Sequence, residues 1–510
     1  MFLIRQIFLP SGSRKSLLFW NWTAGILCGL LNLGCDSAPS SPAPPAEEVV
    51  QPESVEVEIV AGGREINKSD ALKPMPAEPE MTSEPLPQVA PKSVTEPRFS
   101  EAELNELGIE VFSSAQFELR SDAVQPSNEG EFQRLPGYVD QLISWVQSKR
   151  EDRIPSHELK SLQGSIMEDP ALFLQAGLAP EELKDVRHGL YRGQEFWMRE
   201  QQTDYFRRHL LFHEVVHCLL DVQGYAIPVW FHEGMAERIA VHQIDEKGNV
   251  LFAQVPGDSQ VDGGFGRMQL IREEIDAGRF KTLNAVQEIE PREFYSGDTS
   301  YAWAWALCYF LAEHPQTKEQ FTLLTEAKSA QQFKQMTNEM LSHQTDRLKA
   351  DWLVFTSQLE PGFNFQKMLI DWISRSQQTS ADVSFSLDAD HNWQNSGYQV
   401  MAGKTYQITA RGQYVVDDDP KDWICEPQGV SVEYVDGFPL GMVQAVIYDS
   451  ESADAQKERV FLKPIPIGSE RSLTAPKSGT LFFRINDHAN SWENNRGEIA
   501  IQIQARSASE

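Results

Sequence analysis

Phe212-His213-Glu214-Val215-Val216-His217 is the stretch that decides how this chain is expected to fold. On a helix, His213 and His217 lie four residues apart and turn both imidazoles to one face, where they can bind a single cation. Glu214 lies between them and can take a proton from a water that the cation activates. The spacing therefore predicts a metal-binding helix with Glu214 as its general base.

The segment Pro228–Glu237 is expected to supply a third ligand from a second helix. Glu233 and Glu237 are again four residues apart and share a face. Glu233 is the predicted ligand, which gives a His2Glu site with the fourth position open to water. His232 is the alternative, although it points about 100° away from Glu233 on the same helix. Glu237 is expected to accept the free N–H of a liganding histidine, or else to be a solvated surface residue.

The two helices have recognisable ends. Thr203 and Asp204 are good N-caps for the first helix, which should end before Gly224. Pro228 is preset for the first turn of the second helix, which should run to about His242. The residues between the helices leave room for the second to turn back toward the first.

Together the two segments resemble the gluzincin group of zinc metallopeptidases, in particular the peptidase MA-like bacterial domains. The motif of that group is HExxH followed by an aromatic residue, one further residue and EGxAE, and the matching residues are His213, Glu214, His217, Trp230 or Phe231, Glu233, Gly234, Ala236 and Glu237. The resemblance implies that His213, His217 and Glu233 bind zinc and that Glu214 is the base. It also implies a protein or peptide substrate.

Hydrolysis at such a site needs a donor for the developing oxyanion. Gluzincins often use a Tyr or His of the C-terminal lobe, and Tyr301 is the best-placed candidate, with Tyr295 behind it. Both tyrosines could instead be ordinary packing residues. His209, one turn before His213, is expected to be a polar helix residue rather than a ligand.

The chain has 510 residues and a formal net charge of −29. This length predicts two or three folded units with linkers. The charge, with no Lys/Arg cluster, argues against a nucleic-acid partner. Cys218 and Cys308 fall in apolar helical patterns and are expected to be buried thiols rather than a bridge.

The N-terminus has the features of an export signal. Residues 1–35 contain basic residues, then an apolar run, and Leu31-Asn32-Leu33-Gly34-Cys35 resembles a bacterial lipoprotein processing site. That resemblance implies a lipid anchor at Cys35, whereas an ordinary cleaved signal and a retained anchor are the alternatives. Residues 36–98 are rich in Pro, Ala and Glu and are expected to form a disordered stalk. The protein is therefore expected to be exported, as a membrane-anchored periplasmic or surface lipoprotein or as a secreted protein.

The expected fold class is a multidomain α+β protein. Residues 99–370 should form a zincin-like domain with a small sheet and a mainly helical lobe, and residues 379–510 an all-β sandwich, because apolar residues there alternate between turns. The first domain is expected to contain strands at 109–112, 117–120, 159–164 and 171–174 and helices at 135–149, 268–277, 301–312, 317–328 and 331–359. The sandwich strands are expected at 400–403, 406–410, 443–448, 481–485 and 499–503.

A polar loop at Ile485–Gly497 precedes the last predicted strand. Four of its residues offer oxygens that suit a hard cation such as calcium, although on the residues alone a plain polar hairpin is the better explanation: Asp487, Ser491, Asn494 and Asn495. The region resembles the bacterial calcium-dependent galactose-binding lectins of the PA-IL type, in which these positions bind calcium, with Ser here replacing Thr. The resemblance implies a calcium site completed by a backbone carbonyl near Val416, and a carbohydrate or cell-surface ligand.

The sequence thus predicts an exported zinc-dependent metallopeptidase with a C-terminal targeting or surface-binding sandwich. One alternative is a non-catalytic surface binding protein that acts through the sandwich. The complete HExxH and EGxAE set argues against it, because a binding protein needs neither the base nor the three ligands. The other alternative is a zinc hydrolase of non-peptide acyl bonds, which the same residues would serve equally well.

Overall fold

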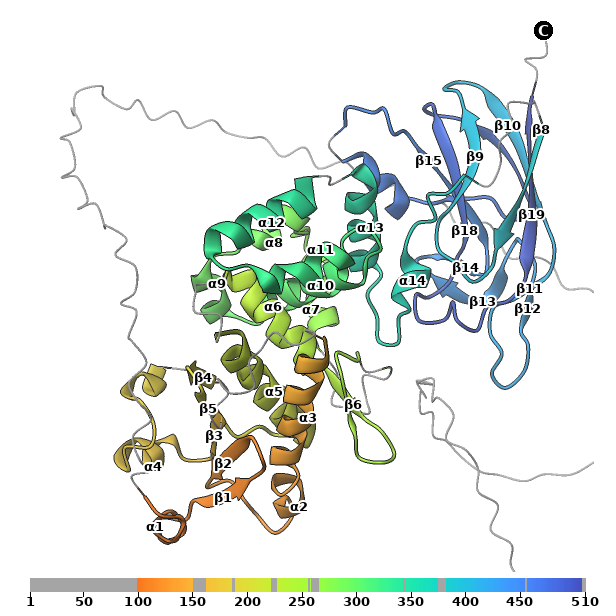
Figure 1. Ribbon diagram of the computed structural model, residues 1–510. Coiled ribbons are helices and arrows are strands. Elements are labelled where there is room, and N and C mark those ends of the chain that lie inside the picture. The colour runs from red at the N-terminus through yellow and green to blue at the C-terminus, as the bar shows by residue number, and fades with distance from the viewer. Residues whose placement is uncertain are drawn as a thin grey trace, which may run out of the picture. The chain divides into compact units, whose positions relative to one another are not determined.

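The computed structural model describes residues 99–149, 162–185, 189–221, 227–255, 257, 266–342, 345–374, 382–454 and 456–506. All of them belong to one compact unit, Pro87–Glu510. The predicted signal peptide (1–35), its Cys35 and the predicted stalk (36–98) lie outside the described residues. Among the helices described, none is both long and apolar enough to cross a membrane. This part of the chain is a mixed α+β structure with several sheets (Figure 1).

The first sheet has five strands in the order β1-β2-β3-β5-β4. The strands β2, β3 and β5 are parallel, and the edge strands β1 and β4 are antiparallel to their neighbours. Their bounds are β1 (Glu110–Ser113), β2 (Phe117–Ser121), β3 (Leu162–Met167), β4 (Gly189–Arg192) and β5 (Glu195–Arg199). Helix α3 (Leu135–Lys149) has its predicted bounds and buries Leu135, Val139, Leu142 and Val146, which share one helical face.

The predicted strand at 171–174 is wrong. Residues 171–174 belong to helix α4 (Pro170–Gln175). Asp169 caps this helix, because its carboxylate accepts a hydrogen bond from the backbone N–H of Ala171. Pro170 occupies the first turn, where its missing N–H costs nothing. These two end signals outweigh the short apolar run that suggested a strand.

Three helices form the centre of the helical region: α5 (Asp204–Asp221), α6 (Val229–Ala240) and α10 (Thr299–Glu313). The first two agree with the predicted helices. Helix α6 packs closely on α10 because Gly234 has no side chain. A Cβ at Gly234 would lie 2.4 Å from the carbonyl oxygen of Ala304 and 2.6 Å from Sγ of Cys308. Cys218 and Cys308 are buried free thiols, as predicted.

The described residues also contain nine further α-helices. They are α1 (Glu101–Glu106), α2 (Glu129–Phe132), α7 (Arg267–Asp276), α8 (Leu283–Gln287), α9 (Pro291–Ser296), α11 (Lys318–Leu323), α12 (Ala330–Ser342), α13 (Asp346–Ser357) and α14 (Phe365–Met368). The predicted helical stretch 331–359 contains two helices, α12 and α13. The second begins at Thr345, whose side chain accepts a hydrogen bond from the backbone N–H of Leu348.

Two four-stranded antiparallel sheets share one hydrophobic core in the C-terminal region. Their orders are β17-β10-β19-β8 and β16-β15-β18-β9. The strands are β8 (Asp382–Asp388), β9 (Gln394–Val400), β10 (Thr405–Arg411), β15 (Val443–Tyr448), β16 (Ile465–Pro466), β17 (Glu470–Thr474), β18 (Gly479–Ile485) and β19 (Glu498–Ala505). The predicted strand at 400–403 is wrong, because β9 ends at Val400 and the chain turns through Gly403, whose φ is +79°.

The helical region and these sheets also share packing. Ala350 and Val354 of α13 belong to one buried cluster with Val446 and Phe482 of the second sheet. Because residues 87–510 form a single compact unit, the division into two domains at residues 370–379 stays a prediction.

Candidate metal centre

Helices α5 and α6 bring the three predicted zinc ligands together. The Nε2 atoms of His213 and His217 are 2.9 Å apart. Oε2 of Glu233 lies 3.3 Å from each of these nitrogens. Both histidines are buried and Glu233 is nearly so. Three donor atoms therefore surround one point between the two packed helices.

This donor set fits zinc. Tetrahedral zinc binds nitrogen and oxygen at about 2.0–2.2 Å, which separates neighbouring ligand atoms by roughly 3.3–3.6 Å. The two separations from Glu233 match this spacing, and the 2.9 Å between the histidines is slightly shorter. Two histidines and one carboxylate leave a fourth position for water or substrate, which is the composition of catalytic zinc sites.

The charges of the cluster also suit a cation. Burial raises the pKa of Glu233, but the neighbouring His217 and His213 outweigh it and hold that pKa well below its usual range. Burial lowers the pKa of His213, but Glu233 and Glu237 outweigh it and raise that pKa to about 10. The pKa of His217 is lowered, chiefly by burial. Ionised carboxylates therefore face a histidine that holds a proton, and a metal cation can take the place of that proton.

Glu214, the predicted base, is buried on α5 beside these ligands. Burial raises its pKa to about 7, so its carboxyl group can both accept and release a proton near neutral pH. Its carboxylate packs against the backbone of Gly189 on the edge strand β4. A Cβ at Gly189 would lie 2.1 Å from Oε1 of Glu214. Gly189 therefore leaves the space that the base occupies.

Glu237 is held by three basic side chains and is only 2% exposed, which excludes the solvated alternative. Its Oε1 lies 3.4 Å from Nδ1 of His213, and its Oε2 lies 3.3 Å from Nε2 of His209. Arg267 donates to both oxygens, at 2.9 and 3.0 Å. His209 thus contacts Glu237, and with His213 these two form a second group of three possible ligand residues. The sequence points to His209 only as a polar helix residue, and nothing local singles out Arg267.

His232 and Tyr191 flank His217, one of the predicted ligands. The His232 ring stacks on the His217 ring with centroids 4.1 Å apart, and the Tyr191 ring lies 5.0 Å from the same histidine. Oη of Tyr191 is 3.4 Å from Nε2 of His232. His232 therefore lies beside the three donor atoms, with its Nδ1 4.0 Å from Oε1 of Glu233. Tyr191 was not a sequence candidate, because it comes from a short strand far upstream of the motif.

Tyr301, on α10, also lies near the cluster. Its ring is 6.2 Å from the His213 ring, and the Arg267 guanidinium lies over it at 5.6 Å. Burial raises the pKa of Tyr301, so its hydroxyl keeps its proton at neutral pH. The side chain of Tyr295, the other candidate, lies outside the described residues.

The predicted calcium residues lie in the loop between β18 and β19. Asp487 and Asn495 are buried and bonded to each other, Nδ2 of Asn495 donating to Oδ2 of Asp487 at 2.9 Å. Nδ2 of Asn494 donates to Oδ1 of Asp417 at 3.1 Å. Ser491 instead donates to Oδ1 of its neighbour Asn490 at 3.1 Å.

Among the described residues, three buried side-chain oxygens of this loop lack a hydrogen-bond partner, one of them Oδ1 of Asn486. Oδ1 of Asn494 and Oδ1 of Asn495 are buried and accept no hydrogen bond from any described residue. Burial also raises the pKa of Asp487 to about 6, because it outweighs the hydrogen bonds from Asn495 and the backbone of His488. Unpartnered oxygens beside a buried carboxyl group are the features that a hard cation such as calcium would satisfy.

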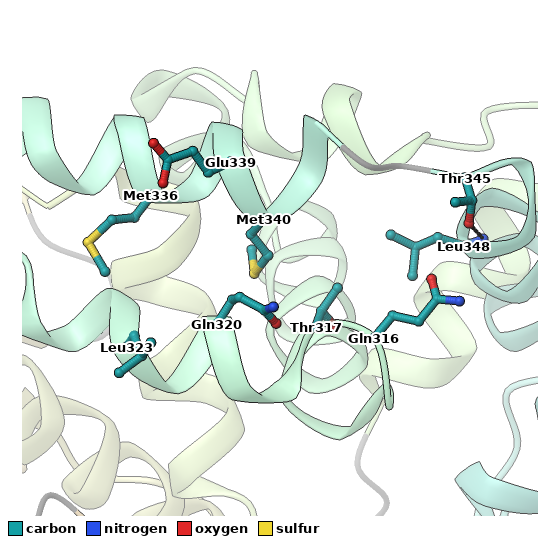
Figure 2. Close-up of a pocket in the computed structure, with 9 residues that line it drawn as sticks. All are labelled: Gln316, Thr317, Gln320, Leu323, Met336, Glu339, Met340, Thr345 and Leu348. Atoms are coloured by element: carbon teal, nitrogen blue, oxygen red, sulfur yellow. Dashed lines mark hydrogen bonds between the residues drawn. The ribbon is translucent and has the colours of Figure 1, made fainter.

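A separate pocket of about 540 Å³ lies among the helices α11, α12 and α13 (Figure 2). It is lined by Gln316, Thr317, Gln320, Leu323, Met336, Glu339, Met340, Thr345 and Leu348. None of these lining residues belongs to the histidine cluster, and only Glu339 among them is ionisable. The pocket is therefore distinct from the metal centre.

No protein-family model matches this chain, and no curated protein matches it. The solved EclA N-terminal domain, a PllA-like lectin, is 20% identical to it over 25% of this chain and 98% of that one, with a TM-score of 0.19. The IMPa metallopeptidase from Pseudomonas aeruginosa is 11% identical over 68% of this chain and 37% of that one, with a TM-score of 0.15. Similarities at these scores assign the chain to no family.

Proposed function

We propose that this protein is an exported zinc-dependent hydrolase that cleaves peptide bonds. The observation that carries the proposal is the group of donor atoms from His213, His217 and Glu233, which lie within 3.3 Å of one another with Glu214 buried beside them. Burying an ionisable carboxyl group costs free energy unless partners compensate it, so a chain keeps such a group where it has a function. A non-catalytic binding protein would have no use for Glu214 at this place.

In this proposal His213, His217 and Glu233 hold the zinc. When bound, zinc polarises a carbonyl group and lowers the pKa of a water molecule. Glu214 accepts the proton of the attacking water and then gives it to the leaving amine, which its pKa of about 7 favours. Glu237 fixes the orientation of His213 through Nδ1.

We assign the oxyanion donor to Tyr191 and keep Tyr301 as the alternative. Tyr191 lies on β4 two residues after Gly189, and residues two apart point to the same side of a strand. The base Glu214 contacts Gly189, so the Tyr191 side chain leaves β4 on the same side of the strand as the base. Burial raises the pKa of Tyr191 and keeps its donor proton in place.

We further propose that Asp487, Asn494 and Asn495 bind calcium, with Ser491 and the backbone near Val416 as additional ligands. The unpartnered buried oxygens of Asn494 and Asn495 support this. The sandwich would then attach the hydrolase to a surface ligand such as carbohydrate. A lipid anchor at Cys35 would hold the exported protein at the membrane.

Cleavage of a denatured-protein library by the purified full chain, compared with its Glu214→Gln variant, tests the hydrolase proposal. We expect cleavage by the parent only, with equal zinc content in both. A matched library of ester substrates distinguishes peptide from other acyl bonds. Equal cleavage by both proteins would contradict the role of Glu214, and cleavage of esters alone would favour the non-peptide hydrolase.

A further inference from the structure

The loop Asp487–Asn495 is anchored in the helical region as well as in the sandwich. Ala489 and Trp492 are 3% and 0% exposed. Both belong to the hydrophobic cluster that contains the buried residues of α5, α6 and α10. The sandwich has a cluster of its own, which contains neither residue. A loop of the sandwich therefore contributes an aromatic side chain to the core that carries the metal centre.

Polar contacts hold the outer side of the same loop. The backbone N–H of Asn490 donates to Oε1 of Glu360 at 3.0 Å, and its Nδ2 donates to the carbonyl of Pro361 at 3.0 Å. Nδ1 of His488 lies 3.4 Å from Oε2 of Glu360. A Cβ at Gly362 would lie 3.5 Å from Cβ of Asn490, so this segment and the loop are in van der Waals range of each other. The segment Glu360–Asn364, between α13 and α14, thus covers the loop.

At the start and end of the loop, in contrast, some buried polar atoms lack hydrogen-bond partners among the described residues. Asp487 and Asn495 are buried, yet Oδ1 of Asn495 and Oδ1 of Asn494 find no donor among the described residues. A buried polar atom without a partner destabilises the conformation that buries it. A cation bound there would remove this destabilisation and favour the loop conformation that places Trp492.

We propose that Asp487–Asn495 is a calcium-dependent clasp that locks the sandwich onto the helical region through Trp492 and Glu360. This inference rests on the calcium site proposed above and is independent of zinc. The partner of this loop surface is the chain's own segment Glu360–Asn364, so a carbohydrate would have to bind elsewhere on the sandwich. Binding and docking are reciprocal: calcium stabilises the docked loop, and docking raises the calcium affinity by the same factor.

Calcium titration of the full chain, followed by calorimetry and by amide hydrogen exchange, tests the clasp. In the parent, we expect calcium to slow exchange in the segment Glu360–Asn364 at least about tenfold, a size typical of coupling between two sites. Asp487→Asn should lose both calcium binding and this response. The control Glu470→Gln, an exposed acidic residue on β17, should keep both.

Glu360→Ala gives the reciprocal readout without disturbing the buried Trp492. Glu360 is not among the proposed calcium ligands, yet this variant should bind calcium roughly 5- to 10-fold more weakly, because it loses contacts of the docked loop. Calcium binding with unchanged exchange at Glu360–Asn364 and unchanged affinity in Glu360→Ala would overturn the clasp while the calcium site stood. Absence of calcium binding in the parent would overturn both, and the zinc proposal would be unaffected.

Discussion

Replacing Arg267 by methionine should both destabilise the fold and weaken zinc binding. The guanidinium donates to both oxygens of Glu237, a carboxylate that is 2% exposed. Removing one partner of a buried ion pair costs about 3–5 kcal/mol, because the other charge is left uncompensated. His209 and His213 still face Glu237 and can take up part of that charge, so we expect the lower end, about 3 kcal/mol.

The effect on zinc follows from the same contacts. Glu237 contacts Nδ1 of His213 and so holds the orientation of its ring. Loss of a residue that orients a metal-binding histidine typically reduces the metal affinity about 10- to 100-fold. Urea denaturation measures the first effect, and competition with a chelator measures the second. The double variant Arg267→Met/Glu237→Gln should recover much of the stability, since no buried charge remains unpaired, but not the zinc affinity.

A surface pair provides the control. Arg279 contacts Glu274 at 2.6 Å but is 61% exposed, so Arg279→Met should leave both the denaturation midpoint and the zinc affinity unchanged. If Arg267→Met behaved like Arg279→Met, Glu237 would not be a buried charge held by Arg267, and the account of the outer contacts would be wrong.

Three further predictions concern single positions. In Gly189→Ala, the added Cβ would lie 2.1 Å from Oε1 of Glu214, so turnover should fall roughly 100-fold by displacement of the base while zinc content, by metal analysis, is kept. Gly234→Ala forces α6 away from Ala304 and should cost about 1–3 kcal/mol in urea denaturation. Burial lowers the pKa of His242 to about 3, so the folded protein binds fewer protons than the unfolded chain. The stability that comes from keeping His242 neutral is fully present above a pH of about 6.5, and it is lost as the pH falls toward 3, at up to about 1.4 kcal/mol per pH unit. The melting temperature of His242→Gln should therefore depend less on acid pH than that of the parent.

The two central helices could be predicted because their signals are local. The spacing of His213 and His217 defines a helical face, and Pro228 marks the start of the second helix. The same reasoning failed at 171–174, where the cap Asp169 and Pro170 decide the structure rather than the apolar run. Periodicity therefore works best where a long segment carries it.

The surroundings of the site could not be predicted in the same way. Three residues reach the cluster only through long-range packing of α7 and of the edge strand β4: Arg267, Gly189 and Tyr191. No local sequence pattern predicts such contacts. Trp492 is a similar case, because a turn residue of the sandwich would not be expected in the core of another region. Long-range packing decides these positions.

Zinc stoichiometry in three proteins tests the central claim most directly: the parent, Glu233→Ala and His232→Ala. Metal analysis after dialysis should find one zinc per parent chain, none in Glu233→Ala, and one in His232→Ala, because His232 lies beside the donor atoms rather than among them. Loss of zinc from His232→Ala with retention in Glu233→Ala would mean that His232, and not Glu233, is the third ligand. A parent chain that binds no zinc would contradict the proposed metal centre altogether.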